Sequence, residues 1–397
     1  MTQCLIRVEC DQMRGAETAP RPRGRRGDAA SLSRKIEFLK RAESYPDRPR
    51  RVTAIETHMS WIFLTDRYAY KLKKPVRLPF LDFGTIEARR RNCERELRLN
   101  RRLAPDVYLA VVPLRATADG RLSLGDKGRI VDWLVKMRRL SGDRTLQHAI
   151  RHESVRAADL RRFVELLVGF YRSTDSAPIS ETRYRQRFEE NIKANRLELA
   201  KRAWHLPTGI IRDVTKAQLD FVIHEPRLLA QRVRDRRIVE GHGDLRPEHV
   251  YLGATPVVTD CLEFNRAFRI LDPADELAYL ALECDMLGSH ETGRRIIELY
   301  RELSGDTVPE RLLDFYMSER ACLRAKLAIW HLREQDARRP AKWRRRALKY
   351  LRLARSYALA LSQRVMISDP GQSLDLKKLY DRAARVKPLD RRREKRR

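Results

Sequence analysis

The order of strand and helix patterns along the chain is the feature that most constrains its fold. Before residue 140, short runs of β-branched and aromatic residues are separated by turn residues; beyond it, apolar side chains recur at helical spacing. Segment 52–76 predicts a β-hairpin, and two more strands are expected at 107–114 and 129–137. Strands first and helices afterwards predict an α+β protein with two lobes, one small and β-rich, the other larger and helical.

Helix patterns and turn signals divide the 397 residues further. Helices are expected at 31–42, 86–103, 183–203 and 315–332 and around 160–170, with a compact strand pair between 240 and 260. We therefore predict an N-terminal lobe at 31–140 and a helical lobe at 141–365. Residues 1–30 mix Pro, Gly and Arg and are expected to form a disordered basic tail, and residues 366–397 a second basic tail.

Net charge and cysteine content limit which partners and which redox state the sequence predicts. The net charge of +30 could attract polyanions, but arginine is spread through nearly every helical segment, which favours a general composition over a nucleic-acid face. A weaker hypothesis is an RNA-associated protein that uses Trp343 and Tyr350 for stacking. The six cysteines show no C-x-x-C spacing, which predicts reduced thiols. Without a signal-peptide pattern or a long apolar run, a cytoplasmic protein with no membrane partner is expected; no pattern fixes an oligomeric state.

Residues 242–260 contain the strongest chemical pattern. A loop that starts at His242-Gly243-Asp244 leads into a short apolar strand, a turn and a second apolar strand that ends near Asp260. A lone loop Asp is more often a turn former than a catalyst, but the trailing hairpin and second Asp resemble the catalytic loop of kinases. Phosphoryl transfer needs positioning and charge neutralisation, which two carboxylates at this separation supply.

The resemblance to the kinase loop implies a role for each of these residues. Asp244 would orient the acceptor hydroxyl, and His242 belongs to the same catalytic motif. Arg246 stands where many kinases keep a lysine beside the transferred phosphate. Asp260 would hold the Mg²⁺ that bridges the phosphates of ATP.

An earlier strand carries the lysine that such a loop requires. Alternation places Ala69 and Lys71 on one face of the strand. In kinases the corresponding Ala lies against adenine and the Lys reaches the α and β phosphates, steadied by a Glu on the next helix. We assign that role to Glu96, with Glu94 as the alternative. The competing hypothesis is an exposed edge strand protected from aggregation by Lys71, Lys73 and Lys74.

Several segments outside these motifs carry a family resemblance. They are residues 56–61, 70–76, 80–83, 97–100, 260–265 and 320–326. Together they resemble a largely uncharacterised bacterial group of aminoglycoside-phosphotransferase-like proteins over residues 31–335. The resemblance implies a protein-kinase-like fold and an ATP-dependent phosphotransferase that uses ATP and Mg²⁺ and acts on a small-molecule hydroxyl. Some relatives carry a P-loop domain, whose G-x-x-x-x-G-K-[ST] motif is absent from this sequence.

Two departures from the kinase pattern leave alternatives open. No G-x-G-x-x-G precedes the strand lysine, so Thr57, His58 and Ser60 would have to contact the phosphates instead.

The second departure is His249, which stands five residues after Asp244, where kinases keep a metal-binding Asn. Mg²⁺ prefers oxygen ligands. Asp260 with Glu263 would carry the metal, or His249 would donate to a phosphate, or catalysis is weak. The alternative function is a catalytically silent nucleotide-binding module.

Overall fold

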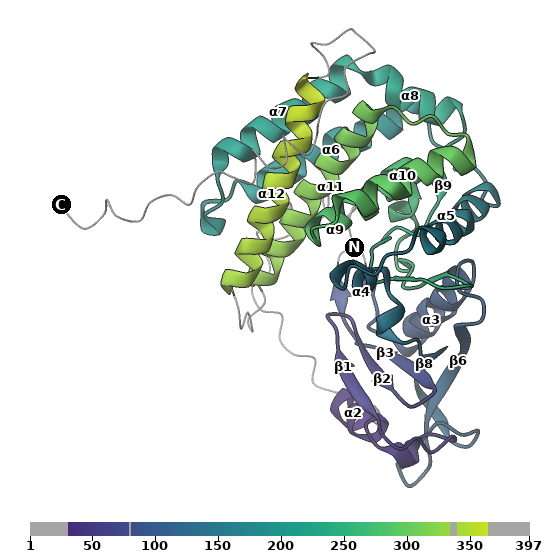
Figure 1. Cartoon of the computed structure of the whole chain (residues 1–397). Coiled ribbons are helices and arrows are strands. Elements are labelled where there is room, and N and C mark those ends of the chain that lie inside the picture. Colours follow the sequence, from purple (N-terminus) through teal and green to yellow (C-terminus); the bar gives the residue numbers. More distant parts are fainter. Residues whose placement is uncertain (1–30, 79–80, 334–339, 364–397) are drawn as a thin grey trace.

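The computed structural model describes residues 31–78, 81–333 and 340–363. An antiparallel sheet with two helices forms one lobe, and a larger helical lobe follows it in the chain (Figure 1). This arrangement confirms the predicted two-lobe α+β fold. The two predicted basic tails, 1–30 and 366–397, lie outside the described residues.

The N-terminal lobe is built on a six-stranded sheet in which every paired neighbour is antiparallel. Its strands, in spatial order, are β1 (Thr53–Glu56), β2 (Ser60–Leu64), β3 (Tyr68–Lys73), β8 (Arg129–Arg138), β6 (Tyr108–Ala116) and β7 (Leu122–Ser123). A separate small hairpin pairs β4 (Arg77–Leu78) with β5 (Leu81–Asp82).

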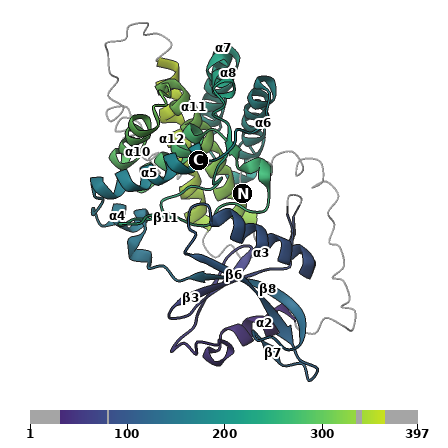
Figure 2. The same ribbon diagram turned by 90° about the vertical axis from the view of Figure 1, so that its right-hand side faces the viewer.

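Two helices cover opposite faces of this sheet. Helix α2 (Leu32–Leu39) packs Ile36 and Leu39 against Phe63, Tyr70 and Leu72 on one face. Helix α3 (Ile86–Asn100) covers the other face, where it lies between the sheet and the helical lobe (Figure 2). Because side chains alternate along a strand, burial of Tyr70 under α2 turns Lys71 toward α3.

Strand β3 lies inside the sheet, between β2 and β8. Lys71 is opposite Ile62 on one side and Val135 on the other. The alternative of an exposed edge strand is therefore wrong, and the lysines of β3 require another explanation.

The helical lobe is assembled around two helices that are buried along almost their whole length, α9 (Pro273–Met286) and α11 (Glu310–Trp330). The surrounding helices are α4 (Leu146–Arg151), α5 (Ala157–Arg172), α6 (Glu181–Leu199), α7 (Thr208–His224), α8 (Pro226–Arg234), α10 (His290–Ser304) and α12 (Pro340–Gln363). Two-residue strands form two antiparallel pairs, β9 (Val239–Glu240) with β12 (Ile270–Leu271) and β10 (Val250–Tyr251) with β11 (Val257–Val258).

The starts predicted at 31, 86 and 183 are within two residues of the observed starts, whereas the start predicted at 315 is five residues late, because α11 begins at Glu310. Ser31 caps α2 by accepting the N–H of Arg34 at 3.3 Å, and Ser180 caps α6 in the same way. The predicted ends at 103 and 203 are wrong by three and four residues, because α3 ends at Asn100 and α6 at Leu199. The chain forms a turn after Asn100, and after Leu199 it forms a turn and a short 3-10 helix, Arg202–Trp204.

Three further expectations, about the cysteines, the RNA-stacking residues and membrane spans, can be compared with the described residues. Cys93, Cys261, Cys284 and Cys322 are buried and unpaired. Tyr350 is buried and its hydroxyl donates to Glu283, so it is not available for stacking on RNA. Among the described helices, none combines the length and apolar character needed to cross a membrane.

Candidate active site

The loop that begins at His242 is fixed to the core helix α9. The carboxylate of Glu276 accepts the backbone N–H of His242 at 3.1 Å and of Gly243 at 2.5 Å, and the Tyr171 hydroxyl at 2.7 Å. Gly243 has φ +86°, and a Cβ there would lie 3.0 Å from Cγ of Arg269. Glycine is therefore required on both conformational and steric grounds.

His242 lies behind the loop rather than in a cavity. Its Nε2–H donates to the carbonyl of Thr259 at 2.9 Å, and its Nδ1 accepts the N–H of Asp244 at 3.3 Å. The side chain is completely buried, and burial lowers the pKa of His242 to about 3. The imidazole is thus neutral and holds the backbone of Asp244 in place.

Asp244 is held by a hydroxyl and a guanidinium. The Tyr279 hydroxyl donates to Oδ1 at 3.1 Å, and Nη2 of Arg246 lies 3.1 Å from Oδ2. Burial alone would raise the pKa of Asp244, but the guanidinium of Arg246 holds that pKa well below its usual range. Arg246 also pairs with Glu248 at 2.7 Å. The Asp244 carboxylate is therefore ionised and oriented.

The lysines of β3 are joined to carboxylates from both lobes. Glu96 of α3 accepts Lys71 at 2.8 Å through Oε1 and Lys73 at 2.5 Å through Oε2. Lys71 also lies 2.8 Å from Oδ1 of Asp260, and Lys73 lies 2.7 Å from Oε1 of Glu263. Burial opposes the charge of Glu96, but the two lysines hold its pKa below the usual value. Lys71 and Lys73 therefore belong to a network of ion pairs between the lobes and not to an exposed lysine cluster on an edge strand.

The structure distinguishes the two candidate glutamates on α3. Glu96 is fully buried beside Lys71, whereas Glu94 is exposed and pairs with Arg90 at 2.8 Å. Only Glu96 shares a face of α3 with the strand lysines.

Asp260 is positioned by its backbone as well as by its side chain. Its φ of +62° is left-handed, a conformation that Asp tolerates better than most residues, and its N–H donates to the Tyr108 hydroxyl at 3.1 Å. The next N–H, from Cys261, donates to Asn100 Oδ1 at 2.8 Å, and Asn100 Nδ2 donates to the carbonyl of Glu96 at 2.9 Å. Helix α3 therefore carries both the partner of Lys71 and the amide that orients the Asp260 segment.

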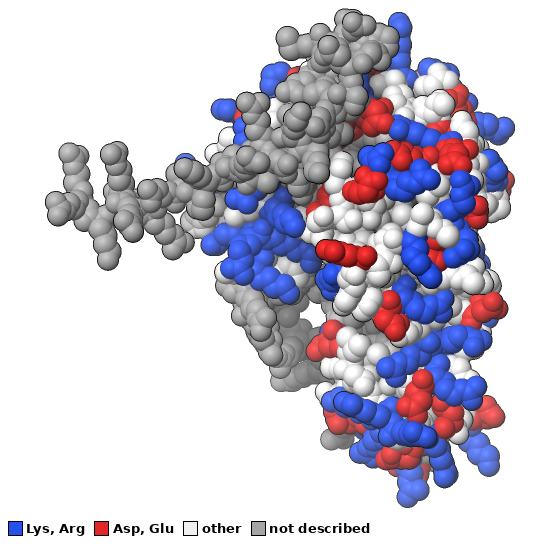
Figure 3. Space-filling model, in the orientation of Figure 1, with Lys and Arg blue, Asp and Glu red and all other residues white. Residues whose placement is uncertain are grey.

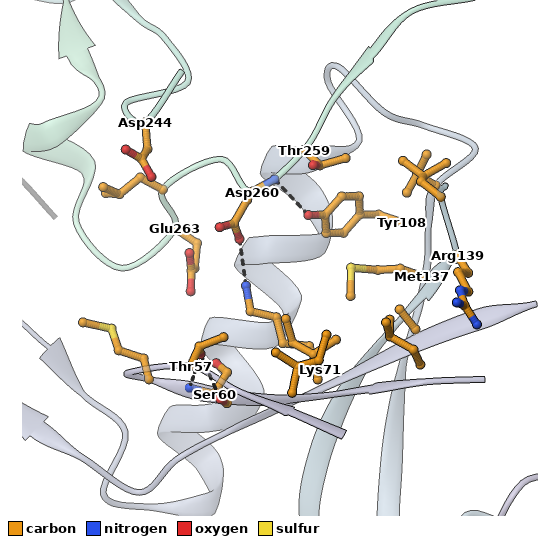
Figure 4. Close-up of a pocket in the computed structure, with 18 of the residues that line it drawn as sticks. Thr57, Ser60, Lys71, Tyr108, Met137, Arg139, Asp244, Thr259, Asp260 and Glu263 are labelled. Atoms are coloured by element: carbon orange, nitrogen blue, oxygen red, sulfur yellow. Dashed lines mark hydrogen bonds and ion pairs between the residues drawn. The ribbon is translucent and has the colours of Figure 1, made fainter. Parts of the chain in front are cut away.

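These groups surround one cavity of about 420 Å³ between the lobes, which we call the interlobe cavity (Figure 4). Ala69, Lys71 and Ser60 of the N-terminal lobe line it, as do Asp244, Arg246, Asp260 and Glu263 of the helical lobe. Its apolar lining includes Ile62, Leu64, Val107, Met137 and Leu140. Apolar walls with charged groups at one end suit a flat base joined to phosphates. His242, Glu96 and His249 stand behind this lining.

The turn between β1 and β2 closes one side of the interlobe cavity. Thr57 Oγ1 donates to the carbonyl of Ser60 at 2.8 Å and accepts the Ser60 N–H at 3.0 Å. The hydroxyl of Thr57 is therefore used within the turn, whereas His58 and Met59 line the cavity from its tip. Contacts from this turn to a phosphate would come from its backbone rather than from Thr57 Oγ1.

Comparisons with known proteins find relatives in sequence and in fold. No family profile matches the chain. Over 279 residues it is 33% identical to uncharacterized proteins of Mycobacterium bovis and Mycobacterium tuberculosis, which covers 68% of this chain and 53% of theirs. The chain thus spans about half the length of these curated relatives.

Among solved structures, a choline kinase from Cryptosporidium parvum superimposes with a TM-score of 0.50 at 9% identity, covering 84% of this chain and 96% of that one. The chain has the protein-kinase-like fold of the choline kinases. A choline/ethanolamine kinase family protein from Mesorhizobium loti gives a TM-score of 0.48 at 11% identity, covering 83% of this chain and 99% of that one. An aminoglycoside phosphotransferase of Streptomyces rimosus, solved with ADP and streptomycin, gives a TM-score of 0.41 at 14% identity, covering 73% of this chain and 97% of that one.

Within this kinase-like fold, His249 departs from the usual metal-binding Asn. Its Nδ1 lies 2.9 Å from the carbonyl of Asp244 and therefore bears the proton. Nε2 is left to accept from Arg246 at 3.1 Å, and it lies 3.6 Å from Oδ2 of Asp260. Arg246 uses the single lone pair of Nε2 and the carbonyl of Asp244 uses the Nδ1–H, so His249 has no N–H left for a phosphate in this arrangement, which argues against the alternative of a phosphate donor.

The donor set for a metal ion is sparse. The described side chains include no group of three or more His, Cys, Asp or Glu that could hold a metal by itself. Asp260 has one oxygen on Lys71, and its side chain is 47% exposed, so its second oxygen can accept a ligand. Mg²⁺ in kinases is held by one or two carboxylates together with phosphate oxygens, so this set fits a metal that arrives with a nucleotide.

Sequence reasoning missed several residues that complete the site in this fold. They are Asn100, Tyr108, Glu276 and Tyr279. One signal was available, because Tyr279 interrupts the apolar stretch 277–282 of α9 and Glu276 directly precedes that stretch, three positions from Tyr279 on the same face, and a buried polar group needs a specific partner.

Proposed function

We propose that the protein is an ATP- and Mg²⁺-dependent phosphotransferase that acts on a hydroxyl group of a small molecule. One observation carries the proposal. Lys71 lies 2.8 Å from both Glu96 and Asp260, at the same cavity that Asp244 lines from the opposite lobe. A lysine, its steadying glutamate, a metal-side aspartate and an acceptor-side aspartate are the parts that phosphoryl transfer requires.

On the nucleotide side, the base would occupy the apolar part of the interlobe cavity, against Ala69. Lys71 would bind the phosphates and Glu96 would keep its ammonium group in place. Asp260 would hold Mg²⁺, with His249 beside it, and Glu263 would act through Lys73. When bound, the metal neutralises charge on the phosphates.

On the acceptor side, Asp244 would orient the attacking hydroxyl and receive its proton as the phosphoryl group transfers. Tyr279 holds one oxygen of Asp244, which leaves its position well defined. Arg246 would stabilise the transferred phosphoryl group, and His242 is a positioning residue that acts through the backbone of Asp244.

A second candidate function is a nucleotide-binding module without turnover. The observation that favours it is His249, because an imidazole nitrogen is a poorer ligand for Mg²⁺ than an amide oxygen. In this alternative, nucleotide binds between the lobes and no acceptor responds.

Transfer of labelled γ-phosphate from ATP to hydroxyl compounds, with and without Mg²⁺, tests the choice. The proposal expects a Mg²⁺-dependent labelled product with at least one acceptor and none with Asp244→Asn. Nucleotide binding with equal background hydrolysis in wild type and Asp244→Asn, and no labelled product, would select the silent module.

A further inference from the structure

A second cavity, of about 410 Å³, adjoins the catalytic loop from the helical lobe, and we call it the basic cavity. Its walls come from α4, the loop after Asp244, the end of α9 and the first half of α12. Arg246 lines both cavities, and its Nη2 lies 3.1 Å from Oδ2 of Asp244. A group bound in the basic cavity would therefore contact the arginine that pairs with Asp244.

Cationic side chains outnumber carboxylates in the basic cavity by five to two. The cations are Arg151, Arg246, Arg345, Arg346 and Lys349, and the carboxylates are Glu248 and Glu283. Lys and Arg side chains also gather where α12 runs, on the left of the space-filling view (Figure 3), whereas much of the remaining visible face mixes both signs of charge.

Both carboxylates are already neutralised within the protein. Glu248 pairs with Arg246 at 2.7 Å. Glu283 is buried, lies 2.8 Å from Nε of Arg324 and accepts the Tyr350 hydroxyl at 2.7 Å. Neither is therefore available as the counter-charge for a cationic ligand.

Several cations of the basic cavity have no carboxylate partner or keep an unused donor. Within the described part of the chain, Arg151 and Arg345 form no ion pair, and Lys349 donates to the carbonyl of Met286 at 2.7 Å. Nε of Arg246 is buried and has no hydrogen-bond acceptor among the described residues. Guanidinium groups with unused donors bind phosphate and carboxylate through paired, charge-assisted hydrogen bonds.

We propose that the acceptor is a hydroxyl compound that also carries an anionic group, a phosphate or a carboxylate, and that the basic cavity binds this group. The inference rests on the proposed function and names the substrate class of the same site. A cationic amino sugar would meet like charges from α4, from α12 and from the catalytic loop, with both local carboxylates already paired. An anion would instead satisfy donors that the protein leaves unused.

Direct binding separates the ligand classes without depending on turnover. Calorimetry of the full chain would use matched sets: glucose, glucose 6-phosphate, gluconate and glucosamine; ribose and ribose 5-phosphate; glycerol and glycerol 3-phosphate. We expect at least one anionic member to bind tenfold or more tightly than its neutral parent, weakening as salt rises, and glucosamine to bind no better than glucose. Glucose 6-phosphate against gluconate distinguishes phosphate from carboxylate. Equal or tighter binding of glucosamine, or no preference for any anion, overturns the inference.

A pair of charge reversals on α12 locates the site. Arg345→Glu should weaken binding of the preferred anion by tenfold or more, whereas Arg355→Glu, an exposed residue of the same helix outside the cavity, should change it less than twofold. Equal effects of the two reversals would mean that net charge, and not the cavity, attracts the anion. Anion binding that depends on Arg345, without phosphoryl transfer to any acceptor, would reject the proposed function and keep the anion site. Phosphoryl transfer to neutral or cationic acceptors alone would keep the proposed function and reject the anion site.

Discussion

At the scale of single residues, two aspartates line one cavity and differ in what holds them. Tyr279 and Arg246 orient Asp244, whereas Lys71 neutralises Asp260. Their side chains therefore face different parts of the proposed reaction, and substitutions should separate them.

We expect Asp244→Asn to lower phosphoryl transfer on the order of a hundredfold or more while ATP binding is retained, because an amide cannot take the acceptor proton. Asp260→Asn should lose both transfer and metal-dependent ATP binding. Initial rates and ATP titrations of the two variants check this. Identical ATP affinities for both would contradict the division of roles.

The two lysines of β3 should also respond differently. Lys73 is 1% exposed between Glu96 and Glu263, so Lys73→Met leaves buried carboxylates short of a cation and should cost about 3–5 kcal/mol in free energy of unfolding. In Lys71→Met, Glu96 keeps Lys73 and Asp260 remains half exposed, so the loss of stability should be smaller and ATP affinity should fall instead. Urea unfolding of both variants measures which one loses more free energy of unfolding. A larger loss for Lys71→Met than for Lys73→Met would contradict this prediction.

At the scale of elements, α9 links the helical core to the catalytic loop. Glu276→Gln should cost about 1–3 kcal/mol in free energy of unfolding, because an amide cannot accept from both backbone N–H groups that the carboxylate serves. The turnover number should fall while the affinity for ATP stays within twofold. Glu302→Gln, at an exposed glutamate of α10, is the matched control. Unchanged turnover in Glu276→Gln would show that the loop keeps its shape without this anchor.

The same loop predicts a pH dependence. The pKa of His242 is about 3 in the folded protein and 6.5 in its reference state, so between these values only the unfolded chain binds the proton. Stability should therefore fall as pH decreases below 6.5, by up to about 1.4 kcal/mol per pH unit from this group. His242→Gln should remove that slope between pH 5 and 6.5. Burial raises the pKa of Glu319 to about 7, so this group changes the free energy of unfolding with pH in the opposite direction. Glu319 is present in both wild type and His242→Gln, so its effect cancels in the comparison between them. Parallel unfolding profiles would contradict the assignment.

The sequence predicts local features of the site and misses those that depend on packing between elements. Alternation along β3 was enough to place Ala69 and Lys71 on one face, and that face lines the interlobe cavity. The assignment of Glu96 kept Glu94 as an alternative, and the burial of Glu96 beside Lys71 decided between them. The second partner of Glu96, Lys73, could not be predicted, because it required β3 to lie inside the sheet. Asn100 and Glu276 act through backbone groups far away in the chain, and no local pattern identifies such contacts.

At the scale of the whole molecule, polar groups join the lobes alongside apolar contacts such as that of Leu103 with the helical core. Besides the ion pairs of Lys71 and Lys73, Arg102 donates to the carbonyls of Glu240 at 2.8 Å and Gly241 at 3.0 Å. The catalytic loop is thus held from the N-terminal lobe as well as from α9.

Nucleotide binding should require a divalent ion, because Asp260 and Glu263 would repel phosphates that arrive without one. Calorimetric titration with ATP in Mg²⁺ and in a chelator checks this expectation, with the wild-type full chain in both. ATP affinity that is equal in the two conditions would contradict it.

The ion pair between Lys71 and Asp260 has a consequence for the order of binding. Before any ligand arrives, the ammonium group already serves as the counter-ion of the carboxylate, so free Mg²⁺ gains little by approaching it. Phosphates that drew Lys71 away would leave the Asp260 carboxylate open to the metal, and a metal at Asp260 would leave Lys71 available to the phosphates. Each ligand would therefore raise the affinity for the other by the same factor, since coupling between two binding events is reciprocal.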